Sequence, residues 1–328
     1  MHSRPLGRTG LEVSEVGFGA WGIGGADFGP TVDAESMAAL NAAVDAGVTF
    51  VDTADVYGAD GHSERLVGRL LAERSERIVA ATKIGRRGPL DVAAYTFENL
   101  RGWAEDSRRH LGVERIDLVQ LHSLPWLTYY TPEVFEAMDR LVETGVIAHY
   151  GVSVERVEEA LKAIEYPGVE TVQIIVNIFR QRPLELFLGE AERRGVGVIA
   201  RVPLASGLLT GKLRSDTAFS ELDHRNFNRH GERFDVGETF SGVDYATGLA
   251  AVEEIRPLVP EGWTMTQLAL RWVLDQPGVS TVIPGARTPE QARANAAASD
   301  LPPLSAETHE RLAGLYRERI APLVHQRW

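Results

Sequence analysis

The chain alternates short apolar runs with longer amphipathic stretches along almost its entire length. Eight runs consist mainly of Val, Ile, Leu and Ala, and they lie at residues 16–19, 49–53, 78–83, 116–122, 149–153, 171–175, 196–202 and 280–283. Such near-continuous apolar runs are typical of parallel strands that are buried on both faces. Eight stretches with helical spacing of apolar residues lie between and after them, at residues 34–46, 63–73, 96–111, 132–144, 154–163, 183–194, 264–275 and 289–297. This order predicts an α/β fold, a (β/α)8 TIM barrel in which a helix follows each strand.

A doubly wound open sheet is the competing architecture, because it also alternates strands with helices. It usually has fewer strands and carries a glycine-rich phosphate loop after its first strand. Residues 22–29 (GIGGADFG) are rich in glycine, but they do not form a clean GxGxxG motif and no helix pattern follows at once. We therefore expect this run to be a βα loop rather than a phosphate cradle, and we favour the barrel.

A chain of 328 residues is long enough for two domains, but the eight βα units account for most of it. We expect a single domain over residues 1–328. Three segments lie outside the repeat. Residues 4–14 predict a β-hairpin that plugs the N-terminal end of the barrel. Residues 213–245 predict a long loop after the seventh strand, over the active face. Residues 304–328 predict a C-terminal helix and tail.

Composition narrows the possible partners. The chain has no cysteine, which excludes disulfides, zinc–thiolate sites and a thiol nucleophile and is compatible with the reducing cytoplasm. A net charge of −12 disfavours nucleic acid or an anionic membrane as the main partner. No apolar run approaches the roughly 20 residues of a membrane helix, and the N-terminus lacks a secretory apolar segment. We expect a cytoplasmic protein with a small-molecule substrate; the oligomeric state is left open.

Four residues with complementary chemistry follow successive strands. Asp52, Lys83 and His122 end the second, third and fourth strands, and Tyr57 lies on the loop after Asp52. In a barrel, side chains at the C-terminal ends of the strands converge on one opening. Each residue alone has an ordinary structural explanation, as a helix cap, a solvated charge or a buried histidine. Their combination on neighbouring units favours a catalytic site.

These residue types are suited to moving a proton to or from a carbonyl oxygen. A free phenol has a pKa of about 10, and a nearby lysine would lower it. Asp52 would hold Lys83 charged, and His122 would orient a substrate carbonyl. Such a group suits proton donation to an oxygen that gains charge as a hydride reaches its carbon. It does not suit a metal site, which needs more converging ligands.

The sequence resembles the aldo-keto reductase superfamily, whose members are NAD(P)H-dependent oxidoreductases on a (β/α)8 barrel. The motifs that carry the resemblance are LGRTGLEVS at residues 6–14, GVTFVDTADVYG at 47–58, ATK at 81–83 and DLVQLH at 117–122. The resemblance extends nearly from end to end. It implies that Asp52, Tyr57, Lys83 and His122 form the catalytic tetrad of the family, with Tyr57 as general acid and base.

The resemblance also implies a set of cofactor residues. Ser153 and Gln173 match positions that bind the nicotinamide carboxamide, and Arg201 stands where many members stack Tyr or Trp on that ring. The pyrophosphate loop would include Pro203, Leu204, Ser206, Gly207, Leu209 and Lys212, and the adenosine end Gly285, Arg287, Gln291 and Asn295. The Arg287 guanidinium suits a phosphate and favours NADP(H) over NAD(H). Gly285 and Gln291 replace a Lys and an Arg of the better-known subgroup, which indicates the bacterial, potassium-channel-β-like branch.

The implied function is NADP-dependent hydride transfer between nicotinamide C4 and an aldehyde, ketone or sugar carbonyl. Trp21 and Trp126 are candidate substrate contacts, because indole rings offer apolar faces with a polar edge. Two alternatives remain open at this point. One is a nucleotide-sensing binding subunit with little turnover, like the channel β subunits of the family. The other is a barrel enzyme without redox chemistry, such as an epimerase or a lyase.

Overall fold

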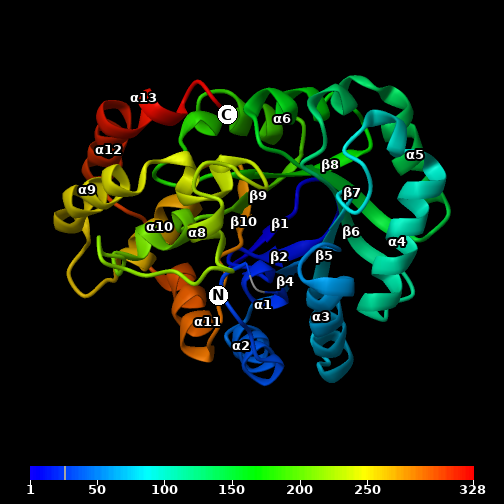
Figure 1. Cartoon of the computed structure of the whole chain (residues 1–328), viewed down its shortest axis with the longest axis horizontal. Coiled ribbons are helices and arrows are strands. Elements are labelled where there is room, and N and C mark those ends of the chain that lie inside the picture. The colour runs from blue at the N-terminus through cyan, green and yellow to red at the C-terminus, as the bar shows by residue number, and fades with distance from the viewer. Residues whose placement is uncertain (26) are drawn as a thin grey trace.

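The computed structural model describes residues 1–25 and 27–328, and a barrel of eight parallel strands lies at its centre (Figure 1). The strands are β3 (Phe18–Gly19), β4 (Phe50–Asp52), β5 (Val79–Ile84), β6 (Ile116–His122), β7 (Ile147–Ser153), β8 (Val169–Ile175), β9 (Gly197–Arg201) and β10 (Val279–Val282). Each pairs with its neighbours in chain order. The N–H groups of Gly17 and Gly19 donate to the carbonyls of Val282 and Pro284 at 2.8 and 3.1 Å, which closes the circle. The predicted (β/α)8 barrel is confirmed.

Helices surround the barrel, as Figure 1 shows. They are α2 (Asp33–Asp45), α3 (His62–Glu73), α4 (Phe97–Leu111), α5 (Pro132–Glu143), α6 (Val157–Ala163), α7 (Phe187–Arg193), α10 (Met265–Leu274) and α11 (Pro289–Ala296). Local sequence sets several boundaries. The Thr96 side chain caps α4, and Gly112 ends it with a left-handed φ of 65°. Helices α6 and α7 begin three and four residues later than the apolar pattern predicts, and a 3₁₀ turn (Arg182–Leu184) precedes α7.

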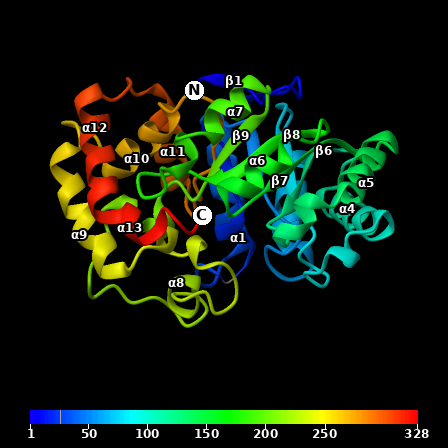
Figure 2. The ribbon, with the colours of Figure 1, turned by 90° about the horizontal axis from the view of Figure 1, so that it is seen from above.

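An antiparallel hairpin of β1 (Ser3–Pro5) and β2 (Glu12–Ser14) closes one end of the barrel. Its Leu6 and Val13 are fully buried in a cluster with Phe50, Leu118 and Ile199 inside the barrel. In Figure 2, β1 lies at the top of the molecule and the short helix α8 (His224–Phe227) lies at the bottom. The hairpin and the segment that carries α8 therefore cover opposite ends, as expected.

Helix α9 (Tyr245–Ile255) is absent from the sequence prediction, which left the residues after 245 without an element. Asp244 caps this helix by accepting a hydrogen bond from the Thr247 N–H at 3.0 Å. Its many Ala and Gly residues weaken the contrast between its faces, so its apolar pattern is inconspicuous. The short helix α1 (Trp21–Gly24) likewise occupies part of an expected loop, and Ala26 of that loop lies outside the described residues.

The C-terminal helix and tail begin with α12 (Ala306–Leu315), continue through a π-helical turn (Tyr316–Ile320) and end with α13 (Ala321–Val324). The irregular stretch between β9 and α9, residues 213–244, is called the β9–α9 segment below. It contains α8 and two 3₁₀ turns, Val236–Glu238 and Phe240–Gly242. Over the described part of the chain, no helix has both the length and the apolar character needed to cross a membrane.

Candidate active site

A cavity of about 790 Å³ lies at the carboxyl ends of the strands. Strand ends contribute Asp52, His122, Ser153, Gln173 and Arg201 to its walls, and the β9–α9 segment contributes its cover. This volume lies within the usual range for small-molecule sites, and the open end of a barrel strand is where such sites are built. The cavity is therefore the candidate active site.

A buried ion pair lies beside the phenol of Tyr57. The Lys83 Nζ donates to Asp52 Oδ2 at 2.5 Å, to the Thr53 carbonyl at 2.9 Å and to the Tyr57 hydroxyl at 3.1 Å. Lys83 and Asp52 are 1% and 2% exposed, so this pair is shielded from water. Adjacent strands β4 and β5 carry the pair, and the loop after β4 returns Tyr57 to the same point. The structure thus brings together three of the four residues that the sequence singled out.

Lys83 acts to lower the pKa of Tyr57, as expected, but the net pKa of the phenol is raised. Burial raises the pKa of Tyr57 above its usual value of 10, and the opposing effect of Lys83 is smaller. Burial also acts to lower the pKa of Lys83, but Asp52 and Tyr57 outweigh it and raise that pKa on balance. At neutral pH the pair is therefore a protonated phenol beside a charged ammonium. This state can donate a proton to a ligand oxygen.

Two side-chain amides donate hydrogen bonds to the Asp52 carboxylate. The Nε2 groups of Gln120 and Gln173 donate to Asp52 Oδ1 at 3.0 and 2.8 Å, and Gln173 Nε2 also donates to Gln120 Oε1 at 3.1 Å. Both glutamines therefore fix the position of the Asp52 carboxylate beside Lys83. Gln120 lies two residues before His122 in β6, and the sequence analysis did not single it out.

His122 ends β6, the strand next to the one that carries Lys83, and it is neutral. Its ring meets the Tyr57 ring edge to face, with centroids 5.8 Å apart. Burial, together with the charges of Lys83, Arg86 and Arg201, holds the pKa of His122 well below its usual 6.5. Its Nδ1 is buried and has no hydrogen-bond partner among the described residues. A neutral imidazole at this position can donate one hydrogen bond to a ligand without competing with Tyr57 for the proton.

Asp55, two residues before Tyr57, is a buried acid without a hydrogen-bond partner among the described residues. Neither carboxylate oxygen has a hydrogen bond within the described chain. Burial, reinforced by the charge of Glu64, raises the pKa of Asp55 to about 8. An acid whose pKa is raised on folding stabilises the fold below its unfolded pKa, and this stability is lost as the pH rises toward the folded value.

We expect Asp55→Asn to remove this pH dependence. Relative to the wild type, the variant should gain about 2–4 kcal/mol of unfolding free energy between pH 5 and pH 8, since each pKa unit corresponds to about 1.4 kcal/mol. Urea unfolding at several pH values measures the difference. Asp216→Asn, at an exposed position, serves as the matched control. A difference between variant and wild type that does not change with pH would contradict the prediction.

Arg201 is held between two acids at the end of β9. Its guanidinium donates to Glu155 Oε2 at 3.0 Å, to the Val154 carbonyl at 2.8 Å and to Glu238 of the β9–α9 segment. Burial opposes the charge, but Glu238 and Glu155 raise the pKa of Arg201 above its usual value. Burial also raises the pKa of Glu238 to about 7. Arg201 lines the cavity as expected, and it also ties the β9–α9 segment to the barrel.

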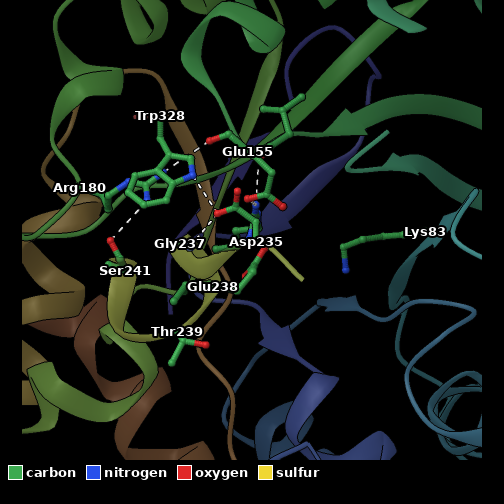
Figure 3. Close-up of polar contacts among 12 residues, drawn as sticks. Lys83, Glu155, Arg180, Asp235, Gly237, Glu238, Thr239, Ser241 and Trp328 are labelled. Atoms are coloured by element: carbon green, nitrogen blue, oxygen red, sulfur yellow. Dashed lines mark hydrogen bonds and ion pairs between the residues drawn. The ribbon is translucent and has the colours of Figure 1, made fainter. Parts of the chain in front are cut away.

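Trp328 lies against Arg180 and close to Glu155, Asp235 and Glu238, as Figure 3 shows. Its indole Nε1 donates to Asp235 Oδ1 at 2.8 Å, and the Arg180 guanidinium lies over its ring at 4.2 Å. A Cβ added at Gly242 would lie 2.4 Å from the indole, so the close approach depends on glycine there. The C-terminal tail therefore fixes the turn that presents Glu238 to Arg201.

The remaining cavity wall begins after β9 with a 3₁₀ turn, Ala205–Thr210. Val202, Ala205 and Ser206 have φ values of 51°, 47° and 53°, in the left-handed region that such residues seldom adopt. The Ser206 hydroxyl donates to the Glu238 carbonyl at 2.9 Å, and Gly207 follows with a φ of 100°. Unusual backbone of this kind is concentrated at ligand sites, where it aims N–H groups at an anion.

At the far end of the cavity, Arg287 joins the loop after β10 to the loop after β3. Its Nη1 donates to the Phe28 carbonyl at 2.6 Å and its Nη2 donates to the Pro30 carbonyl. Gln291 Oε1 accepts from the Arg287 N–H at 2.8 Å. These contacts use two of the five guanidinium donors.

Most residues that the sequence singled out line this one cavity. They are Trp21, Asp52, Tyr57, His122, Ser153, Gln173, Arg201, Pro203, Leu204, Ser206, Gly207, Lys212, Gly285, Arg287, Gln291 and Asn295. Lys83 lies beneath the wall. Leu209 is fully buried away from the cavity, because its side chain packs into the core, and Trp126 is 57% exposed on a turn outside it.

The sequence analysis did not identify several aromatic and basic residues that line the cavity. Phe28 and Arg86 line the cavity from the loops after β3 and β5, and Phe227, Arg233 and Phe234 line it from the β9–α9 segment. His224 of the same segment packs against Trp21, with centroids 4.9 Å apart. The sequence marked this segment as a whole, but nothing in its irregular pattern indicated which side chains turn inward.

Residues 15–317 match the model of the aldo/keto reductase family. The chain belongs to this family. It is 32% identical over 301 residues to the aldo-keto reductase YhdN of Bacillus subtilis (strain 168), covering 90% of this chain and 87% of that protein. It is also 32% identical over 323 residues to a probable voltage-gated potassium channel subunit beta of Oryza sativa subsp. japonica, covering 93% of each. The family and branch expected from the sequence are confirmed.

This aldo/keto reductase also resembles solved structures across nearly its whole length. One is an aldo/keto reductase from Klebsiella pneumoniae in complex with NADP and acetate. The TM-score is 0.71 at 25% identity, and the match covers 96% of each chain. Family membership identifies the protein as an NAD(P)H-dependent oxidoreductase, which confirms the enzyme class expected above.

Proposed function

We propose that this protein transfers a hydride between NADP(H) and an aldehyde, ketone or sugar carbonyl, with Tyr57 as general acid and base. The observation that carries the proposal is the buried chain from Asp52 through Lys83 to the Tyr57 hydroxyl, with a neutral His122 in the same cavity. We place the activity in the cytoplasm, in keeping with a chain that contains no cysteine.

The residues of the chain divide the proton chemistry between them. His122 donates a hydrogen bond to the substrate carbonyl and holds its oxygen beside the Tyr57 hydroxyl. As negative charge develops on that oxygen, Tyr57 donates its proton, and the Lys83 ammonium stabilises the phenolate that remains. Asp52 keeps Lys83 charged and aimed. In the reverse direction, the same phenolate accepts the alcohol proton.

The cavity fits a dinucleotide, which would supply the hydride when bound. Ser153 and the Oε1 of Gln173 would hold the nicotinamide amide, because Gln173 makes its hydrogen bonds in the described chain through Nε2. The turn at Ala205–Thr210, with Lys212 beside it, would hold the phosphates. The solved relative that contains NADP supports the choice of that cofactor.

The proposal is tested by mixing the protein with NADPH and benzaldehyde, methylglyoxal or glyceraldehyde. We expect NADPH to be consumed with at least one of them, and the alcohol to appear in equal amount. NADPH binding without turnover of any carbonyl would instead favour the nucleotide-sensing subunit, which the likeness to a plant channel subunit makes the second candidate. Failure to bind either nicotinamide nucleotide would contradict both and favour a barrel enzyme without redox chemistry.

Replacing Arg287 tests the choice between NADPH and NADH. If its free guanidinium donors bind the 2′-phosphate, Arg287→Ala should raise the Kd for NADPH about tenfold and leave that for NADH nearly unchanged. Titration of nucleotide fluorescence measures both constants, and Arg293→Ala on the exposed side of α11 is the control. An equal loss for both nucleotides would mean that Arg287 acts only by holding Phe28 and Pro30.

A further inference from the structure

Two arginines at the rim of the cavity have no acidic partner among the described residues. Arg86 is half-buried in the loop after β5, and Arg233 is exposed in the β9–α9 segment; both line the cavity. Other arginines nearby are neutralised. Arg87 pairs with Asp106 at 2.9 Å, Arg225 pairs with Asp223 at 2.6 Å, and Arg201 is held between two glutamates. Arg86 and Arg233 are therefore positive charges still available to a ligand.

Both arginines belong to the part of the cavity around Tyr57 and His122: besides burial, the charge of Arg86 contributes to the lowered pKa of His122, and aromatic contacts connect Arg233 to Tyr57. Trp21 stacks on Tyr57 with centroids 5.9 Å apart, and Phe234 meets Trp21 at the same separation. Phe227 continues this wall at 6.1 Å from Phe234, and the Arg233 guanidinium lies 4.8 Å from the Phe227 ring. An aromatic wall thus leads from the phenol to Arg233.

Local contacts position the backbone of both residues. Gly85, with a φ of 109°, turns the chain immediately after Lys83 and Ile84 and directs Arg86 toward the opening that contains His122. The Arg233 N–H donates to the Oδ1 of buried Asn228 at 2.9 Å. Neither position depends on an ion pair, so an incoming anion does not have to displace a carboxylate.

The cavity lining contains more basic than acidic residues, whereas the chain as a whole is acidic. The protein carries 46 acidic and 34 basic residues, for a net charge of −12. The acids that line the cavity are already engaged: Asp52 with Lys83, Glu238 with Arg201, and Asp27 with the Trp21 indole at 2.8 Å. A guanidinium binds carboxylate and phosphate oxygens through paired donors, and the aromatic wall suits an apolar or flat linker.

We propose that Arg86 and Arg233 select carbonyl substrates that carry an oxyanion, a carboxylate or a phosphate, at the end remote from the carbonyl. The inference rests on the proposed function, because it concerns which carbonyl compounds reach Tyr57. The reducible carbonyl lies between His122 and Tyr57, the body of the substrate lies along the aromatic wall, and its anionic group lies between the two arginines.

Two matched substrate pairs test the inference. The first pair is 4-carboxybenzaldehyde and the neutral methyl 4-formylbenzoate, and the second is glyceraldehyde 3-phosphate and glyceraldehyde. We expect the anionic member of at least one pair to have a kcat/KM about 10–100 times higher, mainly through KM, and the advantage to shrink in high salt. The pair that shows the preference distinguishes a carboxylate from a phosphate.

Substitution of Arg86 or Arg233 tests whether these residues cause the preference for the anionic substrate. Arg86→Met and Arg233→Met should each reduce this preference about tenfold, measured as the ratio of kcat/KM for the anionic member to that for the neutral member. Arg229→Met is the control, because Arg229 is exposed in the same segment but does not line the cavity. The Kd for NADPH, measured for every variant, should not change.

Three outcomes would overturn the inference while leaving the proposed function intact. They are equal turnover of both members of each pair by the wild type, equal loss of both members in the variants, and a raised Kd for NADPH that accounts for the loss. Absence of turnover with all four compounds and with the neutral aldehydes above would count against the proposed function itself.

Discussion

Tyr57→Phe should lower carbonyl reduction by about 10²–10⁴-fold, the range that a positioned general acid supplies. The substitution removes one oxygen and retains the ring. That ring stacks on Trp21 at 5.9 Å and lies 4.7 Å from the Lys83 ammonium, so packing around it should be preserved. The loss should appear in kcat, because the hydroxyl donates its proton as charge develops on the substrate oxygen. Steady-state NADPH consumption measures it.

The loss of activity can be assigned to the hydroxyl only if the variant folds and binds NADPH as the wild type does. The Kd for NADPH and the thermal midpoint of Tyr57→Phe should match the wild type. Tyr130→Phe is the matched control, since Tyr130 is 57% exposed on a turn outside the cavity. If Tyr57→Phe reduced carbonyl substrates at a rate within tenfold of the wild type, the phenol would not be the proton donor.

Lys83→Met should impair both activity and stability. Without the ammonium, the pKa of Tyr57 rises further and the phenolate loses its counter-charge, so reduction should fall by at least about 100-fold. Asp52 would also be left as a buried carboxylate without a cation. Removing one member of a buried ion pair typically costs about 3–5 kcal/mol of unfolding free energy. Urea unfolding and NADPH consumption measure the two effects separately.

A double variant separates the two effects of Lys83. Asp52→Asn combined with Lys83→Met removes both charges, so it should recover most of the stability that Lys83→Met loses. It should recover none of the activity, because no cation then faces the Tyr57 hydroxyl. Recovered activity in the stable double variant would show that Lys83 acts only by neutralising Asp52. Loss of stability in the double variant equal to that in the single variant would contradict the electrostatic explanation of its instability.

The barrel was predictable because each of its strands is buried on both faces. The runs at residues 116–122 and 171–175, for example, correspond to β6 and β8 within two residues. Helix α9 was not predictable in the same way, since its Ala and Gly residues leave no clear apolar stripe. The β9–α9 segment is stabilised by side chains from elsewhere, among them Arg201 and Trp328, and local sequence carries no record of such contacts.

At the site, sequence reasoning identified which residues meet but not how their charges balance. The ends of neighbouring parallel strands must converge, so the meeting of Asp52 and Lys83 followed from topology. The pKa of Tyr57 depends on burial as well as on Lys83, and burial is a property of the whole fold. For the same reason Gln120, Arg86 and Arg233 were not found: Gln120 lies inside the DLVQLH motif but its contact with Asp52 depends on the fold, and Arg86 and Arg233 contribute through position alone.

The hydrogen bonds from Gln120 and Gln173 to Asp52 constrain how the site forms during folding. The two hydrogen bonds to Asp52 Oδ1 come from residues 68 and 121 positions further along the chain. The entropy of closing such long loops must be overcome before either bond can form, and contacts of this range slow folding. A partly folded chain with only its first strands in place can pair Asp52 with Lys83, but it leaves that carboxylate without its glutamines. The complete site therefore needs β8 as well as β4, β5 and β6, so the first half of the chain lacks one of its residues.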